Sequence, residues 1–238
     1  MTLIVGLEGQ DGMVLASDSR GTIGDPRSLT AVNDTHKKIF KLSDYCGIAT
    51  SGATELCNRF IDSFKKIVES KDLVNVDDIV QELYEWGRKE FRQWFGAMQF
   101  VQPRGQQIID HRPNIVLIVV GYNKNTDGAN RIYLFTSAMD FVPQLCTSGH
   151  MLGGVPQYAI YLMHRLYNPQ MKLINIKRLA SYLIRETATQ DPKVGGPVRM
   201  AEITLDKGFQ ELTEEEINKI NKENDEQNNK LREFFFKE

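Results

Sequence analysis

The sequence has 238 residues, of which 41% are hydrophobic and 25% are charged. That composition is typical of a folded globular protein and excludes an intrinsically disordered chain. Its 29 Lys and Arg residues and 31 Asp and Glu residues give a net charge of −2, so the chain has no overall basic excess for binding nucleic acid or an anionic membrane surface.

The longest apolar run, Ile115 to Val120, is much shorter than the roughly 18 residues that a membrane-spanning helix needs. The first residues contain no basic region, so we expect no signal peptide. The three widely spaced cysteines (Cys46, Cys57 and Cys146) favour reduced thiols, and no CxxC or HxxxH pair indicates a metal site. We therefore expect a cytoplasmic protein without a metal.

Short apolar segments with turn residues between them predict strands over the first 50 residues. Asp11-Gly12 lies between two apolar runs and is a hairpin signal. Gly21–Asp34 is polar and rich in turn residues, so it predicts a loop. The expected strands are Thr2–Leu7, Met13–Ser17, Lys38–Leu42 and Tyr45–Thr50.

Helical periodicity begins after Gly52, because Leu56, Phe60 and Phe64 fall on one face of a helix. A second helix is predicted over Val76–Ala97, followed by a polar loop over residues 99–112. The elements expected in the second half are strands at Asn114–Tyr122, Arg131–Thr136 and Phe141–Cys146, helices at Pro156–Tyr167 and Ile174–Thr189, a strand at Val198–Leu205 and a last helix that starts with the capping-box pattern of Thr213 to Glu216.

Runs of strands thus alternate with pairs of helices rather than with single crossover helices. This order favours two stacked antiparallel sheets covered by helices over a doubly wound α/β fold. We predict an α+β protein with one domain over residues 1–210. Residues 211–238 are expected to form a charged helix that extends the same domain.

Thr2 directly follows the initiator methionine, and a small second residue permits removal of that methionine. An N-terminal threonine combines a nucleophile with a base, since its hydroxyl attacks while its own α-amine accepts the proton. The ordinary pKa of that amine, ~7.7–8.0, suits a base near neutral pH. Because many chains begin with Met-Thr, this pattern by itself does not identify a nucleophile.

Three further segments extend the pattern: residues 11–20 (DGMVLASDSR), residues 38–42 (KIFKL) and residues 51–55 (SGATE). Together with Thr2, their order and spacing closely resemble a proteasome β-type subunit, apart from a slightly longer loop before the lysine. The resemblance is strong over residues 2–65 and weaker as far as Asp191, and the last helix has no clear match. The Ala-Ser-Asp-Ser-Arg segment is similar to the Anbu-like and other proteasome-related branches.

The resemblance implies the four-layer αββα sandwich of the N-terminal nucleophile (Ntn) hydrolases. It implies that Thr2 is the nucleophile, that Asp18 orients the site and pairs with a lysine, and that Lys38 biases the proton affinities of Thr2 electrostatically. The backbone N–H of Gly52, at a turn that enters a helix, would supply the oxyanion hole. Lys37 is the competing lysine, and we prefer Lys38 because it directly precedes the strand.

The resemblance also implies that Ser148 and Asp191 support the Thr2 amine by hydrogen bonding. The sequence departs from the family pattern at Val194, which replaces a serine, so that one supporting hydrogen bond would be lost. The positions of the family's specificity pocket suggest a mid-sized pocket without a buried charge. These positions are Phe40, Thr50, Thr54 and Asn58.

These residues favour a threonine-type hydrolase that cleaves peptide bonds through an acyl-enzyme on Thr2 and needs no cofactor. The resemblance implies a homo-oligomeric ring or barrel that acts on peptides or unfolded proteins, with or without an unfoldase partner. Two alternatives stay open. One is a transpeptidase or ligase that transfers the acyl group to an amine, and the other is an inactive scaffold subunit.

Residues 213–238 carry eight acidic and five basic side chains, a net charge of −3, whereas the rest of the chain carries +1. The segment nevertheless contains Leu231 and Phe234–Phe236, and full burial of each of these side chains is worth roughly 1.5–3 kcal/mol. Two interpretations follow: these residues fold back on their own domain, or they dock against a neighbouring subunit. We favour docking, because exposed apolar patches usually mark contacts.

Overall fold

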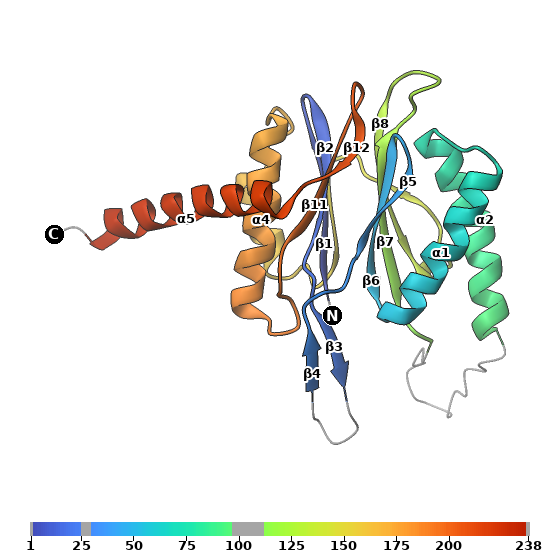
Figure 1. Ribbon diagram of the computed structural model, residues 1–238, viewed down its shortest axis with the longest axis horizontal. Helices are drawn as coiled ribbons and strands as arrows, with labels where there is room; N and C mark the ends of the chain where they lie inside the picture. Colours follow the sequence, from blue (N-terminus) through green and yellow to red (C-terminus); the bar gives the residue numbers. More distant parts are fainter. Residues whose placement is uncertain (1, 25–29, 97–111, 237–238) are drawn as a thin grey trace, which may run out of the picture.

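Two antiparallel five-stranded sheets lie face to face, and helices cover the outer face of each one (Figure 1). The computed structural model describes residues 2–24, 30–96 and 112–236. The αββα sandwich expected from the sequence is therefore confirmed. Among the described residues, no helix is long and apolar enough to cross a membrane.

The first sheet has the strand order β10-β1-β2-β11-β12. Within it, β1 pairs on one side with β2, where Ile4 lies opposite Ser17, and on the other side with β10, where Leu3 lies opposite Gly154. Helices α3 and α4 cover its outer face, and α5 crosses α4 and projects away from the sheets (Figure 1). The bounds are β1 Leu3–Gly9, β2 Gly12–Ser17, β10 His150–Gly154, β11 Arg199–Thr204, β12 Gly208–Glu211, α3 Ala159–Leu166, α4 Leu173–Gln190 and α5 Glu214–Phe236.

The second sheet has the strand order β5-β6-β7-β8-β9, and helices α1 and α2 cover its outer face. The central strand β7 is buried along its whole length. Such a strand has to be apolar on both faces, which explains the continuous run that begins at Ile115. The bounds are β5 Ile39–Ser43, β6 Cys46–Gly52, β7 Ile115–Tyr122, β8 Asn130–Thr136, β9 Gln144–Leu145, α1 Thr54–Ser70 and α2 Val76–Phe95.

Alternation along the strands divides the core into three apolar layers. In β1, Ile4 points toward the other sheet, where it packs with Leu15 and Ile118. Its neighbours Leu3 and Val5 point the other way, toward α3 and α4. Successive side chains of a strand leave on opposite faces, so a strand between two layers needs apolar residues at every position.

Several short strands differ from the prediction. The segment Gly21–Asp34, predicted as a loop, contains the hairpin of β3 (Gly21–Gly24) and β4 (Thr30–Asn33). The strands β10 and β12 were also not predicted. Short segments rich in glycine and polar residues give no period-2 apolar signal, so pairing with a neighbouring strand decides their structure.

The strand predicted over Phe141–Cys146 is reduced to β9. Phe141 has a positive φ of 57° and turns its ring into the core under α1 and α2, which ends any extended structure at that point. The polar loop predicted over residues 99–112 lies, except for Arg112, outside the described residues.

The last helix begins as predicted. The N–H of Glu216 donates to Thr213 Oγ1 at 3.3 Å, and the N–H of Thr213 donates to Glu216 Oε2 at 2.7 Å, which together form a capping box. Ile217 and Ile220 are buried and attach the first turns of α5 to the body.

Candidate active site

Four predicted site residues from the first quarter of the chain lie together at one end of the sandwich. Thr2 directly precedes β1 and is only 4% exposed. Asp18 follows β2, Lys38 precedes β5 and Gly52 is the last residue of β6. The first two strands belong to one sheet and the other two to the facing sheet, so the site lies where these sheet ends meet, and Thr2, Lys38 and Gly52 line a common cavity.

Asp18 and Lys38 form a buried ion pair. Lys38 Nζ donates to Asp18 Oδ1 at 2.8 Å and to the carbonyl oxygen of Arg20 at 2.7 Å. The Asp18 carboxylate also accepts from three backbone N–H groups, those of Leu3 at 3.2 Å, Arg20 at 3.2 Å and Gly195 at 3.1 Å. Asp18 therefore joins the start of β1 to the lysine and to the loop that follows α4.

Burial dominates the electrostatics of this pair. Desolvation lowers the pKa of Lys38 and raises the pKa of Asp18, while the charge of each partner opposes these shifts. The pKa values of the two groups therefore move toward neutrality. Their mutual contact at 2.8 Å supports the charged form of both groups.

Lys37 has a different environment from Lys38. It is exposed and forms a salt bridge with Glu211, with 2.6 Å between Lys37 Nζ and Glu211 Oε1. Successive residues of an extended segment point in opposite directions, so only one of the two lysines can face Asp18. The structure places Lys38 there.

The position of Thr2 is fixed by a segment that sequence reasoning missed. The N–H of Val155 donates to the Thr2 carbonyl oxygen at 2.9 Å. Gly154 has a φ of +87°, and a Cβ at this position would lie 1.8 Å from that same oxygen. Only glycine fits here. The Gly153-Gly154 pair is the sequence signal from which this close approach could have been predicted.

A cavity of about 330 Å³ opens onto Thr2. Strand β3 with Arg20 and His36 forms one wall, and the start of α1 forms the other. Ala53 is the N-cap of α1 and cannot accept a hydrogen bond through its side chain, which leaves the first N–H groups of the helix as donors at this wall. The lining residues besides Thr2 are Arg20, Gly21, Thr22, His36, Gly52, Ala53, Thr54 and Glu55.

Gly52 makes the turn from β6 into α1. Its φ is +142°, and a Cβ would lie 2.3 Å from the carbonyl oxygen of Asn114, which directly precedes β7. The backbone can therefore adopt this turn only with glycine. The turn brings Gly52 to the Thr2 cavity.

Three of the four predicted specificity residues line a small second cavity beside Thr2, namely Thr50, Thr54 and Asn58. The expectation for Phe40 was wrong. Its side chain packs under α1 in the core, with Lys65 Nζ 5.2 Å from its ring centroid. Ile39 points between the sheets, so the alternation of β5 turns Phe40 to the opposite, helix-covered face.

The expectation for Ser148 was also wrong. Val155 lies beside Thr2, whereas the residue after Ser148, Gly149, accepts from the N–H of Glu8 at the other end of β1. Six residues of a strand separate these ends, a distance of roughly 20 Å. Ser148 is exposed and cannot bond to the Thr2 amine, because β10 runs antiparallel to β1 and carries it to the far end of the sheet.

Asp191 ends α4 and lies in the loop that reaches Asp18. Its carboxylate accepts from the N–H of Lys193 at 2.8 Å, within its own turn. Val194 is fully buried and packs with Leu3 in the core beneath α4. The contact between this loop and the site is made by the next residue, through the bond from the Gly195 N–H to Asp18.

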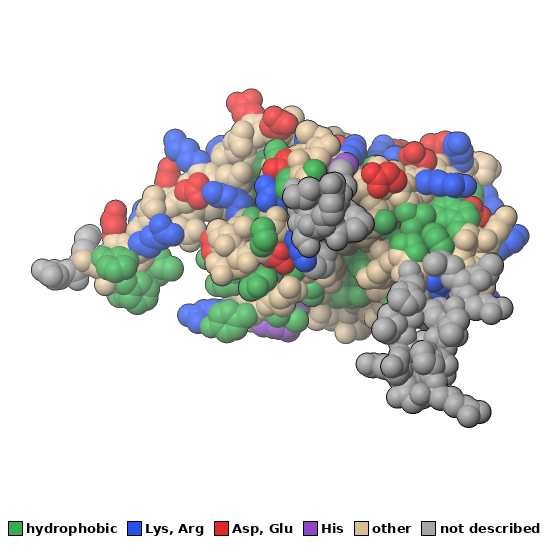
Figure 2. Space-filling model, turned by 90° about the horizontal axis from the view of Figure 1, so that it is seen from below, with side chains coloured by type: hydrophobic (Ala, Val, Ile, Leu, Met, Phe, Trp, Pro, Cys, Tyr) green, Lys and Arg blue, Asp and Glu red, His purple; other side chains and the backbone are tan. Residues whose placement is uncertain are grey.

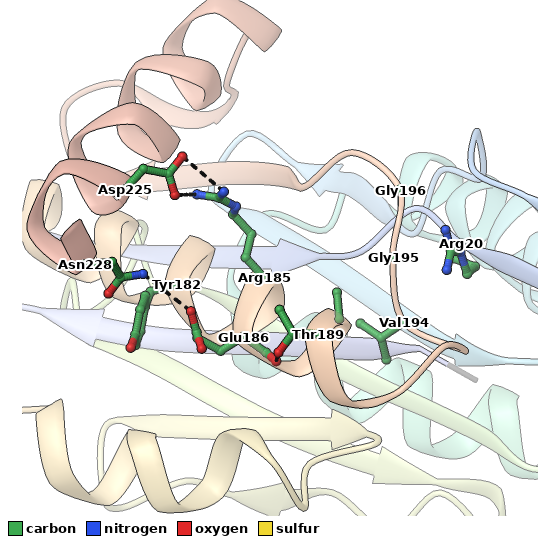
Figure 3. Close-up of a pocket in the computed structure, with 11 residues that line it drawn as sticks. Arg20, Tyr182, Arg185, Glu186, Thr189, Val194, Gly195, Gly196, Asp225 and Asn228 are labelled. Carbon is green, nitrogen blue, oxygen red and sulfur yellow. Dashed lines mark hydrogen bonds and ion pairs between the residues drawn. The ribbon is translucent and has the colours of Figure 1, made fainter. Parts of the chain in front are cut away.

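Arg20 is a second residue that sequence reasoning missed, although it lies two residues after Asp18. Its guanidinium pairs with Asp34 through both oxygens, at 2.8 and 2.9 Å, and donates to the Pro192 carbonyl oxygen at 3.0 Å. A Cβ on Gly195 would lie 2.6 Å from the guanidinium carbon, so Arg20 rests directly on the loop backbone (Figure 3). The ion pair thus fixes the loop that supports Asp18.

The buried cysteines are not part of the group formed by Thr2, Asp18, Lys38 and Gly52. Cys57 lines the small second cavity, and Cys46 lies in the core. Burial raises the pKa of the Cys57 thiol to about 12 and also raises that of Cys46. Both thiols are therefore protonated at neutral pH and serve as packing groups rather than as nucleophiles.

Comparison with known proteins agrees with this geometry. Residues 2–90, which contain Thr2, Asp18, Lys38 and Gly52, match the family model described as proteasome subunit. Over this segment the chain is therefore similar to proteasome subunits.

The similarity to proteasome subunits extends along most of the chain. A proteasome subunit beta from Methanosphaera stadtmanae is 27% identical over 223 residues, covering 93% of this chain and 95% of that protein. One from Methanopyrus kandleri is 26% identical and covers 92% and 94%. Proteasome subunit beta 1 from Streptomyces avermitilis is 24% identical and covers 93% of this chain and 75% of its own length. A narrower placement in the Anbu-like branch stays a prediction.

Proposed function

We propose that this proteasome-like chain is a threonine-type peptidase with Thr2 as its nucleophile. The observation that carries the proposal is the position of Thr2, held at the start of β1 beside the buried Asp18–Lys38 pair and open to a cavity at the N-terminus of α1. The proposal requires removal of Met1, which exposes the α-amine of Thr2 as the base.

The proposed reaction has two steps. Thr2 Oγ1 attacks the scissile carbonyl carbon and gives its proton to the α-amine, and the N–H of Gly52 stabilises the oxyanion. The C–N bond then breaks, the leaving amine takes the proton, and an ester on Thr2 remains. Water hydrolyses this ester and restores the hydroxyl. The charge of Lys38 lowers the pKa of the α-amine, and Asp18 holds that lysine in place.

The proposed substrates are peptides or unfolded segments in a homo-oligomeric assembly. The cavity beside Thr2 accepts an extended chain, and the small second cavity, lined by Thr50, Thr54 and Asn58, favours a small or mid-sized side chain next to the cleaved bond. Support for an assembly comes from the similarity to subunits of the proteasome. The same proposal places the protein in the cytoplasm, with or without an unfoldase that delivers substrates.

Covalent labelling tests the nucleophile. We expect a peptide epoxyketone to form one adduct, located on Thr2 by mass spectrometry, and we expect the intact mass to lack one methionine residue. An intact Met1 in the native protein, with no adduct at Thr2, would contradict the peptidase. If an added peptide amine appears at the new end of the product, the acyl group is transferred rather than hydrolysed, and the protein is a transpeptidase.

One observation favours the inactive scaffold as a second candidate. Val194 replaces the serine of the family pattern, and its side chain is fully buried among apolar residues, so no hydroxyl is offered from this position. The Val194→Ser variant separates the candidates. A scaffold that lost activity at this position gains labelling with the epoxyketone in Val194→Ser, whereas a peptidase is already labelled without the change.

Gly154→Ala is expected to lower peptidase activity at least about tenfold, because the new Cβ displaces the Thr2 carbonyl oxygen, and a displacement of 1 Å at a reacting group costs about a hundredfold. Gly149→Ala is the matched control. It has a similar φ of +75° and a similar clash, with Tyr167, but it lies at the far end of β10. Both variants should lose about 1–3 kcal/mol of stability. Equal activity losses would show that strain alone is responsible.

Asp34→Asn is expected to lower the turnover number roughly three- to tenfold and stability by no more than about 1 kcal/mol. The substitution removes the charge that holds Arg20 on the loop of Gly195, and a loosened loop positions Asp18 less well. Glu82→Gln, which weakens the ion pair with Lys71 between α1 and α2, is the control. Turnover equal to wild type in Asp34→Asn would show that the Arg20–Asp34 ion pair does not help to position Asp18.

A further inference from the structure

The outer end of α5 exposes a cluster of large apolar side chains. Phe234, Phe235 and Phe236 are 74%, 72% and 84% exposed, and Leu231 is 55% exposed. We call these four residues the α5 tip. Figure 2 shows hydrophobic side chains gathered at this end of the helix, apart from the body of the molecule.

The interpretation that these residues fold back on their own domain is wrong. The ring contact of Phe234 is with its neighbour Phe235, at a centroid distance of 5.3 Å. The last hydrogen bond between α5 and the body, within the described residues, joins Asn228 to Glu186. Eight helical residues follow Asn228 and reach about 12 Å further. The helix therefore carries the tip beyond its own α4.

The base of this arm is firmly attached. Asn221 accepts from the hydroxyl of Ser181 at 2.5 Å, and Asp225 pairs with Arg185 at 2.9 Å (Figure 3). Ile217, Ile220, Asn224 and Asn228 follow the helical period of three and four residues on the face that packs against α4, and Leu231 and Phe235 continue the same period. The face of α5 that packs against α4 thus extends beyond the surface of its own chain, and its last residues are apolar.

The same outer layer of the protein offers a surface that fits the tip. Ile160 and Tyr161 of α3, Leu166 at its end and Ile174 of α4 are all exposed, which defines the α3–α4 face. Next to them lies an apolar groove lined by Leu166, Met171, Leu179 and Tyr182, with Asn175, Arg178 and Asn224 at its edges.

Charge complementarity holds the base of α5 on α4 and leaves the tip as an apolar contact surface. Residues 141–185, which include α3 and most of α4, contain five Lys and Arg residues and no Asp or Glu. Helix α5 contains seven acidic and four basic residues, a net charge of −3. Within one chain this complementarity already holds α5 on α4, through the pairs Arg178–Glu223 and Arg185–Asp225. The remainder of the helix, residues 229–236, carries only Glu233 against Lys230 and Arg232, so the contact that the tip offers to a second copy is apolar.

The surface area that the α5 tip can bury is large enough for a stable contact. A buried aromatic side chain covers about 150–250 Å², so the tip offers roughly 400–600 Å². Because the tip and the α3–α4 face lie on the same layer, a two-fold axis brings each tip onto the other copy's face. Two such contacts, counted on both sides, bury roughly 1,600–2,400 Å², the range of stable interfaces. We propose that the α5 tip docks on the α3–α4 face of a second copy of this chain.

Variants on each side of the contact test this docking in the full chain. We expect the combined Phe234→Ser, Phe235→Ser and Phe236→Ser variant to halve the mass of the assembly in light scattering. The patch variant Tyr161→Asp should give the same twofold loss. Met139→Ser removes an equally exposed apolar side chain from the other sheet and should leave the mass unchanged. All these side chains are exposed, so the variants should fold, which circular dichroism checks.

A crosslink identifies the surface that the α5 tip contacts. A photo-reactive phenylalanine at position 235 should form a crosslink between two chains, with its partner residue in α3 or α4. A wild-type monomer, an assembly whose mass is the same in the tip variant, or crosslinks confined to a single chain would each overturn the proposal. A crosslink between chains that maps to α1 or α2 would overturn it as well.

Discussion

Replacing Thr2 with alanine is expected to abolish hydrolysis of a peptide substrate, with kcat/KM at least about a thousandfold lower than in the wild type. The substitution removes the hydroxyl that is proposed to form the acyl-enzyme. The fold should persist, because alanine fits the buried site and the bond from Val155 uses only the backbone of residue 2. Steady-state kinetics with a fluorogenic peptide, together with thermal unfolding, measure both effects.

Two further substitutions serve as controls for Thr2→Ala. Thr2→Ser retains a hydroxyl and should keep measurable activity. Ser148→Ala removes a hydroxyl from the far end of β10 and should behave as wild type. Hydrolysis near the wild-type rate in purified Thr2→Ala would disprove the N-terminal nucleophile mechanism, whatever the other variants do.

Lys38→Ala is expected to lower the turnover number by at least about a hundredfold and to destabilise the protein by about 3–5 kcal/mol. Removing the lysine leaves the Asp18 carboxylate buried without its partner, because this ion pair is almost entirely enclosed. Lys37→Ala breaks only an exposed ion pair with Glu211 and should cost no more than about 1 kcal/mol and little activity.

The pH profile distinguishes the electrostatic role of Lys38 from a purely structural one. A nearby positive charge disfavours the protonated form of the Thr2 amine and lowers its pKa. The amine must be unprotonated to act as the base. Removing the charge of Lys38 should therefore move the acid limb of the pH–activity profile to higher pH, by on the order of one unit. Lys38→Arg keeps the charge and should keep the limb in place.

Two results would contradict the electrostatic role of Lys38 or its position. If Lys38→Ala folds, loses activity and keeps the acid limb of the wild type, then the lysine acts only by holding Asp18. If Lys37→Ala is the more damaging of the two substitutions, the register of the segment before β5 differs from that seen in the structure.

Much of the architecture could be predicted from local patterns. Long elements such as α1, α2 and β7 have strong apolar periodicity, and the alternation of strand runs with helix pairs was sufficient to predict two stacked sheets. The weak elements were missed for the opposite reason. The β3 hairpin and β10 bury few side chains of their own, and they are strands only because another strand lies beside them.

The candidate site divides in the same way. Asp18, Lys38 and Gly52 lie within short segments at strand ends, and the resemblance of these segments to a proteasome β-type subunit predicted their grouping with Thr2. The sequence was sufficient for this prediction. It also determined the capping box that starts α5. In each of these cases the information lies within a few residues of the feature that it specifies.

Only the tertiary structure decided the remaining contacts, because they join residues that are far apart in the chain. The antiparallel register of β10 carries Ser148 away from Thr2 and brings Gly154 against it. The alternation of β5 turns Phe40 into the core. The ion pair of Arg20 with Asp34 exists because the backbone of Gly195 leaves room for a guanidinium, and such packing between distant segments leaves no local pattern in a sequence.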